Sequence, residues 1–275
     1  MNTATSSLPS VGVVGAGRMG TPIIGHLARK GFATAACDVN PAREQSVTAA
    51  GARWVADAAG LSQSDVILVC VGFDAEVRAL LGADGPLADT RPGSIVAILS
   101  TIHPDTVRAL AEAAEPRGVH VIDSTVCRGG DAADKGTLLS FVGGDAQVVG
   151  KIKRVLQAYS ADVVHTGGVG TAQVAKAVNN LILWACLVAD HEALALAQHQ
   201  GVDVEALRQA LMISSCTNGP LGKWGSQTMA WAEDDMAIVA EMAAQAGIGL
   251  PQAAVTREIC RTLKPKRYQL ELYGR

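Results

Sequence analysis

The sequence predicts an α/β protein in which a doubly wound, largely parallel sheet is followed by a long helix and a small all-helical domain. Short apolar runs alternate with helical patterns over residues 11–164, as in a sheet whose strands are joined by helices. Residues 171–200 contain neither proline nor glycine, which predicts one helix about 45 Å long. The predicted divisions are residues 1–166, 167–200 and 201–275.

The first predicted strand, residues 11–14, runs into three glycines with the spacing G-x-G-x-x-G. Gly15 allows the chain to reverse, Gly17 allows the backbone to approach a diphosphate, and Gly20 allows a helix to pack close to the strand. The diphosphate of a dinucleotide binds to unpaired N–H groups at such a helix N-terminus. The stretch therefore predicts a Rossmann-like cofactor site with contacts from Gly15, Ala16, Gly17, Arg18, Met19 and Gly20.

The second predicted strand, residues 34–37, ends at Asp38, near the position about 20 residues on where an acidic residue is expected. A carboxylate here accepts hydrogen bonds from ribose hydroxyls and repels a 2′-phosphate, which favours NAD over NADP. Arg43 leaves NADP open, because its guanidinium reaches a 2′-phosphate if Asp38 turns away. The plain alternative is a glycine turn followed by a surface acid. Val39 and Asn40 are the further contacts predicted here.

The later strands of the predicted sheet alternate with helical segments in the same way. The first four strands are almost continuously apolar, as strands buried on both faces are. The third ends at Gly72 and the fourth leads into Ser100, and both ends are expected on the carboxyl edge where open α/β sheets bind ligands. The strands after the second are expected at residues 66–71, 94–98, 120–123, 138–142 and 162–164.

Residues 123–138 read as an apolar strand that opens into a glycine-rich loop and returns to another strand. The small residues and free N–H groups of such a loop suit a carboxylate, and Arg128 adds a bidentate anion donor. A long hairpin connection without a binding role is the alternative.

The long predicted helix carries Lys176 and Asn180 four residues apart, so both side chains lie on one face near its N-terminus. An ammonium and an amide in this arrangement can both hydrogen-bond a substrate hydroxyl or carbonyl. The alternative is an exposed lysine beside an asparagine pair. A helix apolar around most of its circumference must be covered by other helices or a second subunit, so we expect a homodimer or homotetramer.

Composition and charge narrow the class of protein. Of the 275 residues, 49% are apolar and 18% are charged, which allows a substantial buried core. The net charge of −3 gives no electrostatic footprint for nucleic acid. The first ten residues lack the features of a signal peptide, and polar residues interrupt every apolar stretch before the roughly 18 positions of a membrane span. The six cysteines form no C-x-x-C pair, so we expect a reduced, cytoplasmic protein without structural zinc.

Four of these stretches, residues 15–20, 100–104, 123–138 and 170–180, follow one another in the order and spacing found in the β-hydroxyacid dehydrogenases. The chain resembles that family, which includes 3-hydroxyisobutyrate dehydrogenase and tartronate semialdehyde reductase, over nearly its whole length. The resemblance implies an NAD(P)-dependent enzyme that acts on a small β-hydroxy acid or on its aldehyde or keto partner.

The resemblance also implies roles for single residues. Lys176 matches the catalytic lysine that takes or donates the hydroxyl proton, and Asn180 matches the asparagine that helps to orient the substrate. Thr101 matches the hydroxyl residue near the nicotinamide ribose. The strand end along the cofactor is matched by Cys70, Val71 and Gly72.

The chain departs from the family where the substrate carboxylate is usually held by Ser-Gly-Gly, because it has Cys127, Arg128 and Gly129 there. This predicts a substrate with a second anionic or bulky polar group, or one bound in a different pose. The alternative is that Arg128 faces solvent or a cofactor phosphate. If Arg128 binds substrate, its replacement by glycine raises KM for the substrate more than it changes cofactor binding.

A second departure is Asp234, which stands where the family typically has a lysine directed toward the cofactor. The preceding loop carries Trp224, which is either an aromatic wall of the substrate site or a core residue.

Two other functions stay open at this point. Reduction of a C=N bond, as in imine reductases, is compatible with the acidic residues 233–235, which can hold a cationic iminium, although Lys176 argues against it. A catalytically silent dinucleotide-binding module predicts loss of Lys176 and Asn180, and both are present. The expected partner is a small hydroxy acid, with neither nucleic acid nor membrane.

Overall fold

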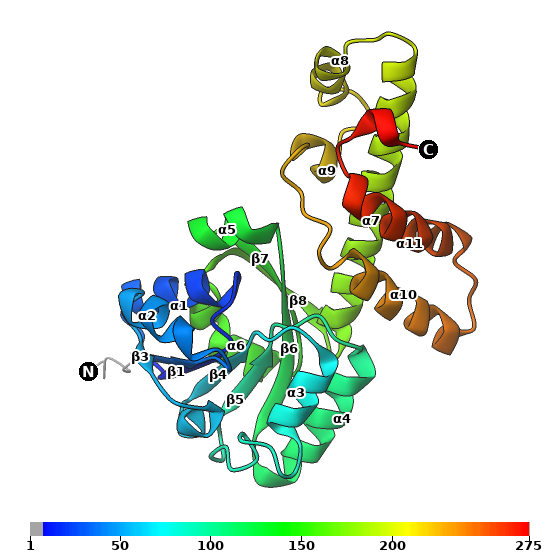
Figure 1. Ribbon diagram of the computed structural model, residues 1–275. Helices are drawn as coiled ribbons and strands as arrows, with labels where there is room; N and C mark the ends of the chain where they lie inside the picture. Colours follow the sequence, from blue (N-terminus) through cyan, green and yellow to red (C-terminus); the bar gives the residue numbers. More distant parts are fainter. Residues whose placement is uncertain (1–7, 275) are drawn as a thin grey trace, which may run out of the picture. The chain divides into compact units, whose positions relative to one another are not determined.

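The computed structural model describes residues 8–274, so most of the segment on which the signal-peptide prediction rests lies outside the described residues. The chain forms two compact units, Met1–Lys176 and Ala177–Arg275 (Figure 1). The boundary falls inside α7 (Thr171–His199), whose first six residues belong to the first unit. The division into residues 1–166, 167–200 and 201–275 stays a prediction.

Within the described residues, the first unit is built on an eight-stranded sheet with the order β3-β2-β1-β4-β5-β6-β7-β8. The strands from β3 to β6 run parallel, β7 is antiparallel to β6, and β8 is parallel to β7. The carboxyl ends of β1, β2, β4, β5 and β6 therefore meet at one edge. The bounds are β1 (Val11–Val14), β2 (Thr34–Cys37), β3 (Arg53–Trp54), β4 (Val66–Val69), β5 (Ile95–Ile98), β6 (His120–Cys127), β7 (Leu138–Gly143) and β8 (Ser160–Gly167).

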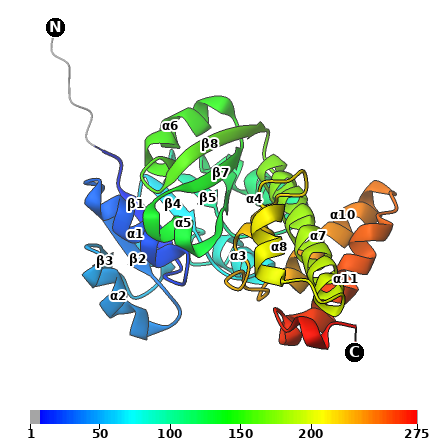
Figure 2. The same cartoon turned by 90° about the horizontal axis from the view of Figure 1, so that it is seen from above.

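Alternate residues of each central strand pack on opposite faces of the sheet, as the period of two requires. Val13 and Leu68 belong to the core with α1, α2, α5 and α6, whereas Val14 and Ile67 belong to the core with α3 and α4. Figure 2 shows α6 beside β8, and Figure 1 shows α3 beside α4. This confirms the doubly wound sheet. The helices are α1 (Gly20–Arg29), α2 (Glu44–Ala49), α3 (Asp74–Leu81), α4 (Pro104–Ala114), α5 (Gly129–Lys135) and α6 (Ala146–Leu156).

The prediction for residues 123–138 is wrong in detail. Strand β6 continues through Cys127, because it keeps its antiparallel pairing with β7 as far as Leu139. The expected glycine-rich loop is mostly the short helix α5, which begins after Arg128 in left-handed conformation and ends at Gly136 in the same conformation. Strand β3 was not predicted, since its two residues pair only with the edge of β2.

The second unit is all-helical, as predicted. It contains the rest of α7, α8 (Val204–Leu211), α9 (Gly219–Gly222), α10 (Ala232–Ala246) and α11 (Pro251–Leu263). Its core includes Trp184 and Leu187 of α7 with Met236 of α10 and Cys260 of α11. The one-turn helix α9 lies in the predicted loop that carries Trp224, and Asn218 caps it by accepting the Leu221 N–H at 2.9 Å.

Helix α7 is long and apolar enough to cross a membrane by length and composition alone. The criterion averages hydropathy over 18 residues, so α7 meets it although Lys176, Asn179, Asn180 and Asp190 interrupt its apolar runs, and the absence of a membrane span stays a prediction. The core helix of a soluble protein passes the same test. Asp190 and His191 are buried on α7, and they hydrogen-bond Asn218 and the Tyr268 N–H within the second unit.

Candidate active site

The three glycines after β1 differ in what keeps a side chain out. A Cβ on Gly15, whose φ is +98°, would lie 2.2 Å from the Cys70 carbonyl oxygen, and one on Gly20 would lie 1.9 Å from the Gly15 oxygen. A Cβ on Gly17 would meet nothing within 4 Å. The packing of the chain therefore requires Gly15 and Gly20 but not Gly17. The open space over Gly17 fits the close approach of a ligand.

The N-terminus of α1 lies directly after this turn. Its N-cap, Met19, makes no side-chain capping hydrogen bond, so the first N–H groups of the helix lack the side-chain acceptor that a serine or aspartate would give. The positive end of the helix and the cradle over Gly17 together fit a diphosphate. The residues predicted to bind the cofactor from Gly15 to Gly20 thus form one turn at the carboxyl end of β1.

Asp38 lies at the end of β2, next to this turn. Its carboxylate accepts the Ala16 N–H at 2.7 Å and the Asn40 N–H at 2.9 Å. Val39 is 98% exposed, and Arg43 follows on the surface. The structure therefore brings the predicted Asp38, Val39 and Asn40 beside the glycine turn, where a carboxylate suits a free ribose. Burial, with help from Asp57 and Asp38, raises the pKa of the neighbouring Cys37 thiol to about 12, which keeps it protonated.

The ends of β4 and β5 bring the other predicted cofactor residues to the same edge. The Cys70 N–H donates to Val14 O at 2.8 Å, and the Val71 N–H donates to Ser100 Oγ at 3.0 Å. The Gly72 N–H donates to Glu76 Oε2, which caps α3. Thr101 follows Ser100 in the loop that leads to α4. Phe73, the N-cap of α3, is 50% exposed and was not among the predicted site residues.

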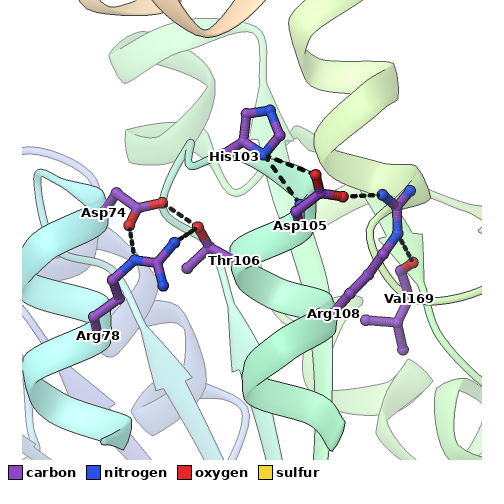
Figure 3. A network of polar contacts seen from close by, with 7 residues as sticks. All are labelled: Asp74, Arg78, His103, Asp105, Thr106, Arg108 and Val169. Atoms are coloured by element: carbon purple, nitrogen blue, oxygen red, sulfur yellow. Dashed lines mark hydrogen bonds and ion pairs between the residues drawn. The ribbon is translucent and has the colours of Figure 1, made fainter. Parts of the chain in front are cut away.

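Two polar networks hold the helices that follow these strands (Figure 3). In the first, Thr106 donates to Asp74 at the start of α3, and Arg78 donates to both residues. In the second, Arg108 binds Asp105 at 2.6 Å and the Val169 carbonyl at 3.4 Å. Helix α4 is thus tied to α3 on one side and to the turn before α7 on the other.

Lys176 lies at the carboxyl end of β6. Its Nζ donates to the Val126 carbonyl oxygen at 2.8 Å and lies 3.9 Å from Cys127 Sγ. The Cys127 side chain is buried. Asn180 is one helical turn further along α7, only 2% exposed, and accepts a hydrogen bond from Asn179 at 3.0 Å. The predicted lysine therefore lies at the end of the strand that leads into Cys127, Arg128 and Gly129, the residues predicted to hold the substrate carboxylate.

Two buried residues that were not predicted hold the start of α7. Asp123 accepts the N–H groups of Gly170 at 2.8 Å and Gln173 at 2.9 Å. Burial raises the pKa of the Asp123 carboxyl, and these hydrogen bonds oppose the shift. The side chain of Gln173 binds the main chain of Ser100 and Ile102. A carboxylate inside an apolar strand was the signal available for Asp123, whereas Gln173 had none.

The Arg128 side chain binds protein groups outside the glycine turn that is predicted to hold the cofactor diphosphate. Its guanidinium donates to Asp162 Oδ2 on β8 at 2.6 Å and to Thr137 O at 3.1 Å. Its φ is +86°, the left-handed region that favours glycine. Arg128 therefore has the backbone conformation typical of the glycine that the family usually has at this position, and its side chain is directed toward β8. A substrate contact from Cys127, Arg128 or Gly129 stays a prediction.

Helix α5 packs against the cofactor helix α1. Arg18 makes a two-fold ion pair with Asp134, both distances being 2.7 Å, and His26 Nε2 lies 3.0 Å from the Ala133 oxygen. A Cβ on Gly130 would lie 2.5 Å from the Arg18 guanidinium, and one on Gly136 would lie 2.7 Å from the His26 ring. Arg18, predicted as a cofactor contact, thus joins the glycine turn to the predicted substrate segment.

The predicted features of the second unit have packing partners there. The ring of Trp224 lies 4.5 Å from His191 and 4.9 Å from Tyr268, in accord with the core alternative, and its contact with substrate stays a prediction. Asp235 accepts the Trp184 indole N–H at 2.9 Å, and Glu233 pairs with Lys264 at 3.4 Å. Two of the three acids at 233–235 are therefore engaged inside this unit.

Over residues 8–274, no group of three or more histidine, cysteine or acidic side chains is arranged to hold a metal ion. The six cysteines are free thiols, and Cys216 is exposed.

Two family models match the chain. The NAD binding domain of 6-phosphogluconate dehydrogenase matches residues 10–168. The model described as NAD-binding of NADP-dependent 3-hydroxyisobutyrate dehydrogenase matches residues 170–270. Together the matches follow the two parts of the fold.

Comparison with individual proteins gives similar sequences and folds among dehydrogenases and reductases. An NAD-dependent L-serine dehydrogenase of Pseudomonas aeruginosa is 32% identical over 216 residues, which are 78% of this chain and 72% of the relative. The structure of Mycobacterium tuberculosis 3-hydroxyisobutyrate dehydrogenase with L-serine has a TM-score of 0.85 at 22% identity and covers 95% of each chain. An imine reductase of Myxococcus stipitatus with NADP+ has a TM-score of 0.69 at 20% identity, covering 94% of this chain and 95% of that one. The two structural likenesses show the shared fold.

Proposed function

The chain belongs to the β-hydroxyacid dehydrogenase family, and from this premise we propose that Lys176 is the acid–base group for a small β-hydroxy acid. The observation that carries the proposal is the position of Lys176 Nζ, 2.8 Å from Val126 O at the end of β6. That strand end lies on the same edge of the sheet as the glycine turn after β1.

The enzyme is an NAD(P)-dependent dehydrogenase of the class that acts on CH–OH groups. NAD is the cofactor, with NADP possible, and it supplies the hydride acceptor when bound. The turn from Gly15 to Gly20 fits its diphosphate, and Asp38 fits a ribose with free hydroxyls. The first feature is a property of the backbone and the second is the charge of a single carboxylate.

Lys176 has the chemistry that proton transfer from a hydroxyl requires. As a neutral amine it accepts the hydroxyl proton during oxidation, and as an ammonium it returns that proton during reduction. Val126 O takes one of its N–H donors and holds Nζ in place, so the remaining capacity of the nitrogen is available to a substrate oxygen. Asn180, on the same helix face, is proposed to orient that oxygen.

The substrate class follows from the relatives and from the substrate segment. L-serine and 3-hydroxyisobutyrate, the substrates in the relatives' names, are both small 3-hydroxy acids with one carboxylate. Cys127 and the backbone at Arg128 and Gly129 are proposed to border the carboxylate. Because the Arg128 guanidinium binds Asp162, a substrate with a second anionic group is less favoured than the sequence suggested.

The test is a panel of L-serine, 3-hydroxyisobutyrate and a cyclic imine with NAD(H) and NADP(H), followed at the nicotinamide absorbance band. Oxidation of a hydroxy acid, with a kcat about 1,000-fold lower in Lys176→Ala, is the expected result. Turnover of the imine alone would overturn the proposal in favour of C=N reduction. Binding of NADH without turnover of any compound would favour a silent module.

We also propose that the protein is a cytoplasmic homodimer or homotetramer. On α7, Val178, Ile182 and Leu196 are 52%, 58% and 64% exposed, which is unusual for large apolar side chains on a core helix. The free thiols are compatible with a reducing compartment. Light scattering of the purified protein tests the association, and a monomeric mass would contradict it.

A further inference from the structure

The side chain of Gln173 is 1% exposed and uses both ends of its carboxamide. Its Nε2 donates to Ser100 O at 2.8 Å, and its Oε1 accepts the Ile102 N–H at 3.0 Å. These two residues flank Thr101, so the carboxamide binds the loop after β5 on both sides of that residue. A single side chain therefore holds the main chain of the Thr101 loop.

The main chain of Gln173 is fixed by a different strand. Its N–H donates to Asp123 Oδ2 at 2.9 Å, and the other oxygen of Asp123 accepts the Gly170 N–H at 2.8 Å. Thr125 donates to Ala172 O at 3.0 Å. Asp123 and Thr125 are both fully buried on β6. Because β5 and β6 are neighbours, Gln173 joins the loop after one strand to the helix held by the next.

These contacts fix how α7 is placed along and around its own axis at the sheet edge. Lys176 is three residues after Gln173, so it lies about 4.5 Å further along the helix and on an adjoining face. Its Nζ reaches Val126 O on the same strand that carries Asp123 and Thr125. A shift of the first turn of α7 therefore moves the amine relative to the Thr101 loop.

We infer that Gln173 is a positioning residue that sets the place of the Lys176 amine relative to the Thr101 loop. The inference rests on the proposed role of Lys176 and adds a residue that acts through it. Misplacement of a reacting group by about 1 Å can cost about 100-fold in rate. We therefore expect the loss of the carboxamide contacts to lower kcat more than it lowers cofactor affinity.

The first variant is Gln173→Met, which keeps the length of the side chain and removes both hydrogen-bonding groups. Asp123 still caps α7 and Thr125 still binds it, so the variant is expected to fold. We expect kcat to fall about 10- to 100-fold, with NADH affinity by fluorescence within about threefold, because the glycine turn and Asp38 are untouched. Gln198→Met, the same change at an exposed position of the same helix, is the matched control.

Gln173→Glu separates the two hydrogen bonds. The glutamate keeps an acceptor for the Ile102 N–H but loses the donor to Ser100 O, so we expect a kcat below wild type in this variant too. A lower melting temperature with unchanged kcat in both variants would show a merely structural role and overturn the inference.

A double variant distinguishes this inference from the proposed function. If Gln173 acts through Lys176, adding Gln173→Met to Lys176→Ala lowers the residual rate no further, whereas independent effects multiply. Full activity of Lys176→Ala would contradict the proposed function. Loss of activity in Lys176→Ala together with an unchanged kcat in Gln173→Met would contradict only the positioning role.

Discussion

The two halves of the sheet edge in the first unit are built in different ways. The cofactor half is made by consecutive residues, Gly15 to Gly20. It consists of main-chain groups and of the open space over Gly17, which has no side chain. The half that holds Lys176 is made by side chains far apart in sequence, as in the bonds from Gln173 to Asp123 and to Ser100, which span 50 and 73 residues. A short sequence motif is therefore enough to encode the cofactor half. The residues of the other half come together only when the sheet folds.

Removal of the Lys176 amine is expected to have the largest effect of the variants that test this contrast. We expect Lys176→Ala to lower kcat by about 1,000-fold, within the range of a lost acid–base group, and to leave NADH affinity within a few-fold. Steady-state kinetics and NADH fluorescence measure the two effects. A large loss of NADH affinity would mean that the halves are not separate.

The glycine turn offers a sharper pair of variants. Gly20→Ala places a Cβ against the Gly15 oxygen, so we expect a destabilisation of about 1–3 kcal/mol as well as lost NADH binding. Gly17→Ala meets no protein atom, so its melting temperature should match wild type while NADH affinity falls at least about tenfold. Thermal melts and fluorescence titrations separate the two. Equal melting losses would contradict the role of the open space.

The choice of dinucleotide should change when the charge at Asp38 is removed. Asp38→Asn keeps an acceptor but removes the repulsion of a 2′-phosphate, and we expect the preference for NAD over NADP to fall about tenfold, the scale of one charge-assisted hydrogen bond. The ratio of kcat/KM values for the two cofactors measures it. An unchanged ratio would assign the choice to another group, with Arg43 the next to test.

The smallest effect is expected at Arg128. Its guanidinium binds Asp162 and Thr137, and about half of the pair is exposed, so Arg128→Gly should change KM for the hydroxy acid by less than about threefold. This reverses the expectation drawn from the sequence. Asp162→Asn is the control, because it releases the guanidinium without removing it. A KM rise above about tenfold in Arg128→Gly alone would return Arg128 to the substrate site.

Sequence patterns were sufficient where structure depends on neighbours in the chain. The glycine turn, Asp38 after β2, the buried parallel strands and the length of α7 all follow from short-range spacing and apolar runs. Lys176 and Asn180 could be proposed as a pair because a helix repeats its faces every three to four residues, and their roles stay predictions. The resemblance to a family then gave these residues roles.

Patterns failed where a residue's neighbours come from other elements. Residues 124–127 read as loop, but pairing with β7 keeps them in β6. The bond between the Arg128 guanidinium and Asp162 on β8 had no signal in the sequence, because the two residues are 34 positions apart. Gln173 carried no signal, because its importance lies in two main-chain groups more than 70 residues away.

The hydrogen bond from Lys176 to Val126 goes to a main-chain oxygen, which every amino acid at position 126 would provide. Substitutions among the side chains of residues 126–128 can therefore change the proposed substrate contacts without removing the hydrogen-bond partner of the Lys176 amine. The Cys-Arg-Gly sequence in place of Ser-Gly-Gly is such an exchange. If these residues border the substrate as proposed, protein engineering can vary substrate scope in this segment while Lys176 keeps its bond to Val126 O.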